Sequence, residues 1–140
     1  MVMKKDIVEK TKEELKEIIT DYPVDFVIIF GSLVKGNFRE DSDIDIAIHL
    51  QRDLELLEIG DIVSRLETKL EKSVDIVILN NLYKMDPVMA FEIISKGMPI
   101  YVINKEKFVE FLHSFILNSF AQYYNQLMSD SDGKAKENIK

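Results

Sequence analysis

The sequence contains no cysteine, only two histidines, and fewer basic than acidic residues. Without cysteine, disulfides, thiolate metal sites and cysteine nucleophiles are excluded. His49 and His113 have no second metal ligand at a suitable spacing, so we expect them to be packing or surface residues. The net charge of −7 opposes unassisted binding to nucleic acid, because affinity for a phosphate backbone comes mainly from Lys and Arg. We therefore expect no direct nucleic-acid partner.

Apolar runs long enough to cross a membrane are also missing, and residues 1–6 lead into a charged helical pattern rather than the core of a signal peptide. These features predict a cytoplasmic protein without membrane contact. Hydrophobic residues make up 46% and charged residues 31% of the chain, which is typical of a folded globular protein. At 140 residues the chain suffices for one domain with a core and is too short for two ordinary ones.

The apolar periodicity predicts alternating helices and strands. Asp86-Pro87 is typical of a helix start, Gly97 of a helix end, and Pro99 indicates an edge strand after it. The predicted helices cover about residues 4–20, 53–72 and 88–96, and the predicted strands residues 26–30, 43–50, 73–79 and 100–103.

A last helix over about residues 105–128 has apolar side chains around roughly two thirds of its circumference. Such a helix either lies in a groove that covers several of its sides or presents an interface to another protein, and we favour the interface. Residues 129–140 are polar and are predicted to form a disordered tail. The expected organisation is thus one domain over residues 1–128 followed by this tail.

Asp43 and Asp45 are the residues that most clearly indicate a chemistry. Side chains of a strand alternate between its faces, so the two carboxylates project from the same side, about 7 Å apart along the backbone, while Ile44 and Ile46 point to the other side. Paired carboxylates disfavour each other's ionisation unless a cation neutralises them, and their oxygen atoms suit Mg²⁺ or Mn²⁺. The pair predicts half of a metal site.

Asp75, at the start of a separate predicted strand, is the best candidate for a third carboxylate. Three carboxylates can hold two divalent ions about 3.5–4 Å apart, the arrangement that serves phosphoryl and nucleotidyl transfer. Asp75 would bind the ion on the side of the nucleophile and accept the proton of the attacking hydroxyl. Glu40 and Asp41 are rivals, but acidic residues are ordinary in the turn where they lie.

Gly31 and Ser32 follow the first strand, and ten residues separate Ser32 from Asp43 of the acidic pair. Glycine lets a phosphate approach the backbone, and the following amides with the Ser32 hydroxyl can hold terminal phosphate oxygens. Lys35 and Arg39 could add positive charge toward a triphosphate, although solvated loop cations are the commoner case.

Together, residues 31–36 (Gly-Ser-Leu-Val-Lys-Gly) and 39–45 (Arg-Glu-Asp-Ser-Asp-Ile-Asp) resemble the signature of the DNA polymerase β-like nucleotidyltransferase superfamily. Because the chain is short, it is most similar to the minimal nucleotidyltransferases, including the antitoxins of HEPN–MNT toxin–antitoxin pairs. Asp75 stands in the place of the third carboxylate, and residues 91–97 with Ile100-Tyr101 resemble a segment of those antitoxins. Lys35 stands where many relatives have arginine, which keeps the charge but loses bidentate geometry.

The resemblance implies an α/β (α+β) fold, with a mixed β-sheet flanked by helices, that binds two Mg²⁺ ions, or Mn²⁺, and a nucleoside triphosphate, commonly ATP. It implies Asp43, Asp45 and Asp75 as catalytic and metal-binding residues, and Gly31 and Ser32 as nucleotide-binding residues. In the antitoxin branch it implies transfer of AMP to a tyrosine of a HEPN ribonuclease toxin, which also forms a complex with the antitoxin, here partly through residues 105–128.

Two other functions remain open. One is a small-molecule nucleotidyltransferase of the aminoglycoside type, although such enzymes usually carry additional substrate-binding structure. The other is a non-catalytic antitoxin that silences its partner by occlusion. The intact acidic residues favour catalysis over occlusion, and both can coexist in one protein.

Overall fold

The computed structural model describes the backbone of residues 4–139 and the side chains of residues 6–129. The chain forms two compact units, Met1–Phe108 and Val109–Lys140. The first unit contains the strands of the described chain, and the second consists of a helical segment. Of the helices in the described part, none is both long and apolar enough to span a membrane. The expected single domain over residues 1–128 stays a prediction.

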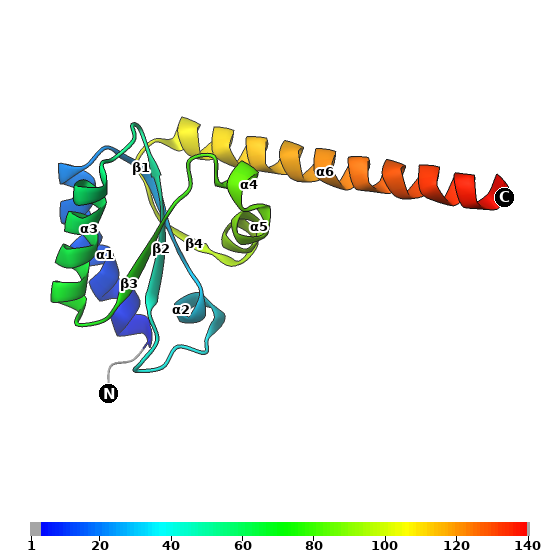
Figure 1. The fold of residues 1–140 in the computed structure, drawn as a ribbon. Helices are drawn as coiled ribbons and strands as arrows, with labels where there is room; N and C mark the ends of the chain where they lie inside the picture. The colour runs from blue at the N-terminus through cyan, green and yellow to red at the C-terminus, as the bar shows by residue number, and fades with distance from the viewer. Residues whose placement is uncertain (1–3, 140) are drawn as a thin grey trace. The chain divides into compact units, whose positions relative to one another are not determined.

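The first unit is built on a four-stranded sheet in the order β3-β2-β1-β4 (Figure 1). Strand β1 pairs antiparallel with β2 and β4, whereas β2 and β3 run parallel. The predicted mixed sheet is confirmed, and β4 lies at its edge, as Pro99 indicated. The strands are β1 (Val24–Phe30), β2 (Ile44–Leu50), β3 (Val74–Ile78) and β4 (Met98–Val102).

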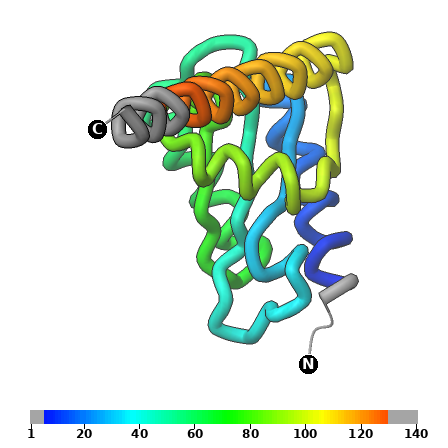
Figure 2. The backbone as a smooth tube through the Cα atoms, turned by 90° about the vertical axis from the view of Figure 1, so that its right-hand side faces the viewer, coloured from blue at the N-terminus to red at the C-terminus, as the bar shows by residue number. Residues whose placement is uncertain are grey.

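Helices cover both faces of this sheet. Helices α1 (Lys4–Asp21) and α3 (Leu56–Leu70) lie on one face, and α5 (Pro87–Lys96) lies on the other. Figure 2, seen from the side of α5, shows this helix crossing in front of the strands and α1 behind them. Because β2 and β3 are parallel, the chain needs a crossover between them, and α3 supplies it.

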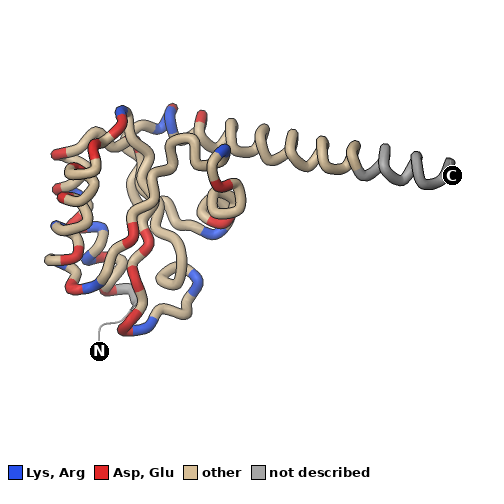
Figure 3. The backbone as a smooth tube through the Cα atoms, viewed as in Figure 1, with Lys and Arg blue, Asp and Glu red and all other residues tan. Residues whose placement is uncertain are grey.

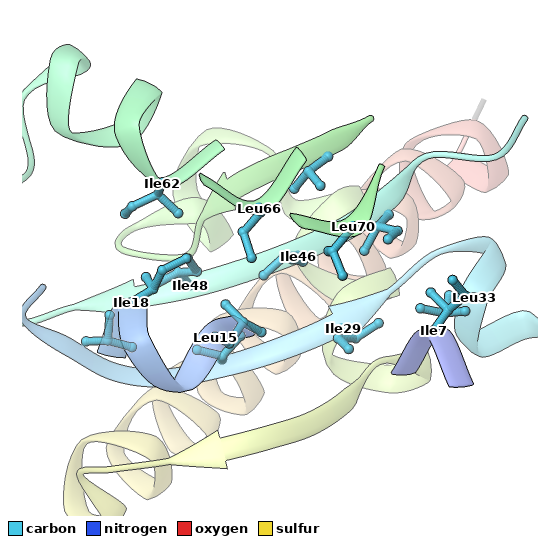
Figure 4. Close-up of a cluster of buried hydrophobic side chains, with 14 of the residues drawn as sticks. Ile7, Leu15, Ile18, Ile29, Leu33, Ile46, Ile48, Ile62, Leu66 and Leu70 are labelled. Carbon is cyan, nitrogen blue, oxygen red and sulfur yellow. The ribbon is translucent and has the colours of Figure 1, made fainter. Parts of the chain in front are cut away.

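The main core lies between the sheet and the pair α1 and α3 (Figure 4). Strand β2 contributes alternate residues to this core, which places the intervening residues of β2 on the opposite face. Each helix contributes a stripe of side chains at helical spacing. The fully or almost fully buried members include Leu15, Ile18, Val27, Ile29, Ile44, Ile46, Ile48, Ile62, Leu66 and Leu70.

Helix α5 begins and ends where the sequence predicts. The Asp86 carboxylate accepts a hydrogen bond from the Met89 amide at 3.1 Å, and Pro87 occupies the first helical position. The helix ends at Lys96 because Gly97 adopts an extended conformation with φ −73°. A Cβ atom on Gly97 would lie 2.3 Å from the carbonyl oxygen of Ile93 and 2.6 Å from Cγ2 of Ile28. Glycine here allows α5 to approach β1 closely.

Two short helices were not predicted: α2 (Ser32–Lys35) and α4 (Leu82–Met85). Each spans a single turn, which is too short to show helical periodicity in the sequence. Gly36, with φ 93°, directly follows α2 and ends it. The expected turn before β2 is confirmed, since the Ser42 amide donates to the Arg39 carbonyl at 3.0 Å.

The last helix, α6 (Lys105–Ile139), begins at the predicted residue. Asn104 caps it, because its side-chain oxygen accepts a hydrogen bond from the Lys107 amide at 3.1 Å. The helix is longer than the predicted 105–128. The sequence predicts a disordered tail over residues 129–140. Almost all side chains of this segment lie outside the described part, so the tail stays a prediction.

Two glycines offer an internal comparison of backbone packing. We expect Gly97→Ala to lower the free energy of unfolding by about 1–3 kcal/mol, because the added methyl group overlaps backbone and a buried side chain. Gly60 lies inside α3, and a Cβ there meets nothing within 4 Å. We expect Gly60→Ala to raise the free energy of unfolding by about 0.5–1 kcal/mol. Chemical denaturation followed by circular dichroism measures both, and equal effects of the two substitutions would contradict the packing described for Gly97.

Candidate active site

The parallel pairing of β2 with β3 places two aspartates side by side. Asp45 on β2 is the register partner of Asp75 on β3, and Figure 3 shows acidic segments on these neighbouring strands. The adjacent partners Ile44 and Val74 are buried. Because side chains alternate along a strand, the two carboxylates lie on the face opposite to the α1 and α3 core.

Gly31 lies directly against the Asp45 carboxylate. A Cβ atom on Gly31 would be 2.1 Å from Oδ2 of Asp45, so any other residue would displace this side chain. The φ of Gly31 is +77°, a conformation that residues other than glycine rarely adopt. Gly31 therefore ends β1 and leaves room for Asp45 at the same time. The sequence indicated a glycine for phosphate approach; the space it leaves for Asp45 came only from the structure.

Asp45 is the most strongly perturbed acidic group of the site. The pKa of Asp45 is raised from 3.8 to about 6; burial is the largest cause, and the negative charges of Asp75 and Asp43 act in the same direction. A hydrogen bond between the carboxyl groups of Asp45 and Asp75 adds to the increase, whereas the positive charge of Lys35 opposes it. The half-buried Asp45 is thus held where its negative charge is unfavourable without a nearby cation.

Asp43 precedes β2 and is exposed. Its influence on the pKa of Asp45 shows that its carboxylate lies within electrostatic reach of the pair on β2 and β3. The rival candidates Glu40 and Asp41 lie in the turn before β2, where the Glu40 carbonyl accepts a hydrogen bond from Lys72 Nζ at 2.8 Å. Asp43, Asp45 and Asp75 are therefore the carboxylates that the fold relates electrostatically.

Lys35 ends the short helix α2 that starts at Ser32, just after Gly31. Its ammonium group forms an ion pair with Glu92 of α5 and also lowers the pKa of Asp45. Sequence reasoning missed Glu92 as a neighbour of the site, because the partners are separated by 57 residues and only the packing of α5 brings them together. Arg39 is exposed in the turn before β2, where its amide donates to Ser42 Oγ at 2.8 Å.

The donor set at this position suits a divalent cation chemically. All three candidate ligands are carboxylates, and hard oxygen donors are those that Mg²⁺ and Mn²⁺ prefer. Among the described side chains, no three acidic or histidine residues already converge as a complete ligand set. What the structure supplies is a raised pKa of Asp45, caused in part by the charges of Asp75 and Asp43, and a bound cation would favour the ionised form of Asp45.

His49 has a packing role, as its sequence context suggested. Its ring stacks on Phe26 with a centroid separation of 4.8 Å, and Nδ1 lies 2.9 Å from Oδ2 of the buried Asp25. His49 thus belongs to the interior of the sheet rather than to the acidic cluster.

A cavity of about 220 Å³ lies between α1 and α3, on the other face of the sheet. Its lining includes Arg65, whose guanidinium is engaged by Asp21 at 2.9 Å and approaches Asp61 at 3.6 Å. The residues of the acidic cluster are not part of that lining. The acidic cluster and this cavity therefore lie at different places. The carboxylates, and not the cavity, define the candidate active site.

The fold is a nucleotidyltransferase fold. Residues 13–106 match the model of the family described as "Polymerase beta, Nucleotidyltransferase". The chain belongs to this family.

Two relatives from Methanocaldococcus jannaschii are named as candidate protein adenylyltransferases. One is 36% identical over 78 residues, which cover 56% of this chain and 87% of the relative. The other is 37% identical over 79 residues, which cover 56% of this chain and 78% of the relative. Both relatives therefore align over most of their own length.

Solved structures share the fold. A chain from a crystal structure of a toxin–antitoxin with AMP-PNP superimposes with a TM-score of 0.67 and 19% identity, covering 86% of this chain and 96% of that chain. A chain from the structure of a tri-AMPylated Shewanella oneidensis HEPN toxin in complex with its MNT antitoxin gives a TM-score of 0.61 and 17% identity, covering 86% and 94%. A candidate minimal nucleotidyltransferase gives 0.59 and 25% identity, covering 71% and 97%.

The raised pKa of Asp45 gives stability a specific pH dependence. Between pH 4 and 6 the folded state binds the proton of the Asp45 carboxyl group more tightly than the unfolded state does. The contribution of this proton to the free energy of unfolding is therefore present at low pH and is lost as the pH rises through about 6. Asp45→Asn carries no titrating proton. We therefore expect the variant to gain stability relative to the wild type as the pH rises from 4 to 6, with a constant difference above pH 7.

Urea unfolding at a series of pH values measures this difference. A difference that does not change between pH 4 and 7 would contradict the environment described for Asp45.

At pH 8, MgCl₂ should raise the melting temperature of the wild type more than that of Asp45→Asn, with NaCl of equal ionic strength as the control.

Proposed function

We propose that this chain is a Mg²⁺-dependent protein adenylyltransferase that transfers AMP from ATP to a tyrosine hydroxyl of a HEPN ribonuclease toxin and thereby acts as its antitoxin. We place the reaction in the cytoplasm, because it consumes ATP. The observation that carries the proposal is the register pairing of Asp45 with Asp75 beside Gly31. This arrangement places two carboxylates next to a glycine turn that a phosphate can approach.

The proposed roles follow the positions of these groups. Asp43 and Asp45 would bind both metal ions, and Asp75 would bind the one on the side of the acceptor. When bound, the ions supply charge neutralisation of the triphosphate and activation of the acceptor oxygen. Gly31 and Ser32 would hold phosphate oxygens at the start of α2.

The reaction is an in-line displacement at the α-phosphorus of ATP. The acceptor oxygen forms a bond to this phosphorus, and the bond from the phosphorus to the bridging oxygen of the β-phosphate breaks. AMP remains on the acceptor and pyrophosphate leaves. Asp75 would take the proton of the attacking hydroxyl, and the fixed strands would hold the groups in line without a large rearrangement.

A protein acceptor is supported by the names of the relatives. The Methanocaldococcus jannaschii proteins are named for protein adenylylation, and the Shewanella oneidensis structure contains an AMPylated HEPN toxin. The toxin and its tyrosine are therefore the substrate that we propose here.

Helix α6 offers a surface on which such a partner could dock. Residues 111–129 contain no Asp, Glu, Lys or Arg, and large apolar side chains of this segment are exposed. Phe120 is 68% exposed and Tyr123 65%. The exposed set is Ile116, Leu117, Phe120, Tyr123, Tyr124, Leu127 and Met128. An exposed apolar stretch of this length is typical of a protein interface.

The same surface favours a second candidate function, in which the chain silences its toxin by binding alone. Occlusion needs the α6 surface and does not need the carboxylates. The two functions therefore differ in which residues they require.

Transfer of label tests the enzymatic proposal. The chain is incubated with Mg²⁺, ATP radiolabelled at the α-phosphate, and the HEPN ribonuclease toxin proposed as its partner. We expect label on a toxin tyrosine, identified by peptide mass spectrometry as an adenylate. We expect at least a hundredfold slower transfer with Asp43→Ala/Asp45→Ala, because the groups that neutralise the triphosphate are lost.

ATP labelled at the γ-phosphate serves as the control, since it should leave no label on the toxin. Absence of transfer by the wild type, combined with continued suppression of toxicity by the double variant, would overturn the enzymatic proposal and leave occlusion.

A charge placed on α6 tests the docking surface. We expect Leu117→Glu to weaken toxin binding at least tenfold, since a carboxylate in an apolar interface loses its hydration. Gln122→Glu is the matched control, because it adds the same charge to an exposed polar position of α6. Calorimetric titration with catalytically inactive toxin measures both. Equal affinities for the two variants would place the interface elsewhere.

A further inference from the structure

The ion pair between Lys35 and Glu92 connects the two elements that flank the acidic cluster. Lys35 is the last residue of α2, and Glu92 lies within α5. Their side chains are 41% and 42% exposed, so the pair faces solvent rather than the core. Exposed pairs contribute little to stability, so its place beside the site is the more informative property.

Lys35 interacts with two acidic groups at once. Its hydrogen bond holds the pKa of Glu92 below the ordinary range, and its positive charge reaches Asp45 across the site. A lysine ammonium has three donors, and the contact with Glu92 occupies one of them. The remaining donors are available to a ligand that approaches Asp45.

Glu92 is held by a rigid support. Its neighbours Ala90 and Ile93 are buried, Asp86 caps the start of α5, and Gly97 allows the end of the helix to lie against β1. Lys35, in contrast, has a flexible four-carbon side chain on a helix of four residues. The ion pair therefore links the Lys35 side chain to a helix that is packed against the sheet.

We propose that Glu92 is a positioning residue that holds the Lys35 ammonium at the site, so that Lys35 can contact the β- and γ-phosphates of the bound nucleotide. This inference rests on the proposed nucleotidyl transfer and adds a residue to its binding machinery. A lysine fixed before binding loses less conformational entropy when the nucleotide arrives. Arg39, in the turn before β2, has no corresponding anchor among the interactions described for it.

A double-mutant cycle tests this inference. Binding of α,β-methylene-ATP with Mg²⁺, which cannot undergo AMP transfer, is measured by calorimetry. We expect Glu92→Gln to weaken binding about two- to fivefold, the range for an exposed ion pair. We expect Lys35→Met to weaken it about tenfold or more, and Glu92→Gln to have no further effect in the Lys35→Met background. In AMP transfer, Glu92→Gln should raise KM for ATP and leave kcat within about twofold.

Asp21→Asn provides the control, because it removes the partner of another exposed ion pair, with Arg65 at 2.9 Å, on the other face of the sheet. It should leave nucleotide binding unchanged. Unchanged or tighter binding by Glu92→Gln, or an equal loss in the Lys35→Met background, would overturn the positioning role while the proposed function stands. A wild type that binds no nucleotide would overturn the proposed function and this inference together.

Discussion

The register of β2 against β3 is the constraint on which the rest of the site depends. It makes Asp45 the partner of Asp75, while Ile44 and Ile46 on either side enter the core. A slip by one residue would turn Asp45 into an apolar interior and bring isoleucine to the acidic face. Helix α3 fixes this register, because it connects the two strands and buries its own apolar stripe on them. Ordinary hydrophobic packing thus determines where the carboxylates meet.

The negative charge of Asp45 is electrostatically unfavourable, and the packing of the folded protein keeps it in place. Asp45 is half-buried between other carboxylates, and Gly31 leaves only enough room for its side chain. Burial and repulsion both favour the protonated form, so the folded protein holds the site ready for a cation at the expense of its own stability near neutral pH. Lys35 partly offsets this cost, and Glu92 ties Lys35 to α5. One face of the sheet carries the α1 and α3 core, and the other carries Asp45 and Asp75.

Much of the fold could be predicted from the sequence, because long periodic segments indicate their own secondary structure. The helix at Asp86-Pro87, its end before Gly97 and the edge strand after it are confirmed. Helices α2 and α4 are single turns without periodicity and were missed. Asp45 and Asp75 could be named from spacing and resemblance, whereas their pairing is a tertiary property. Glu92 carries no local signal, since its partner lies on an element distant in sequence. The assignment of Asp43, Asp45 and Asp75 as metal ligands stays a prediction.

A crystal structure with Mn²⁺ and α,β-methylene-ATP tests the central claim most directly, because anomalous scattering locates Mn²⁺ independently of the fold. We expect Mn²⁺ bound by carboxylate oxygens of Asp43 and Asp45, with Asp75 as a further ligand, and the triphosphate beside Gly31 and Ser32. Ordered nucleotide and Mn²⁺ at another place, such as the cavity between α1 and α3, would contradict the account.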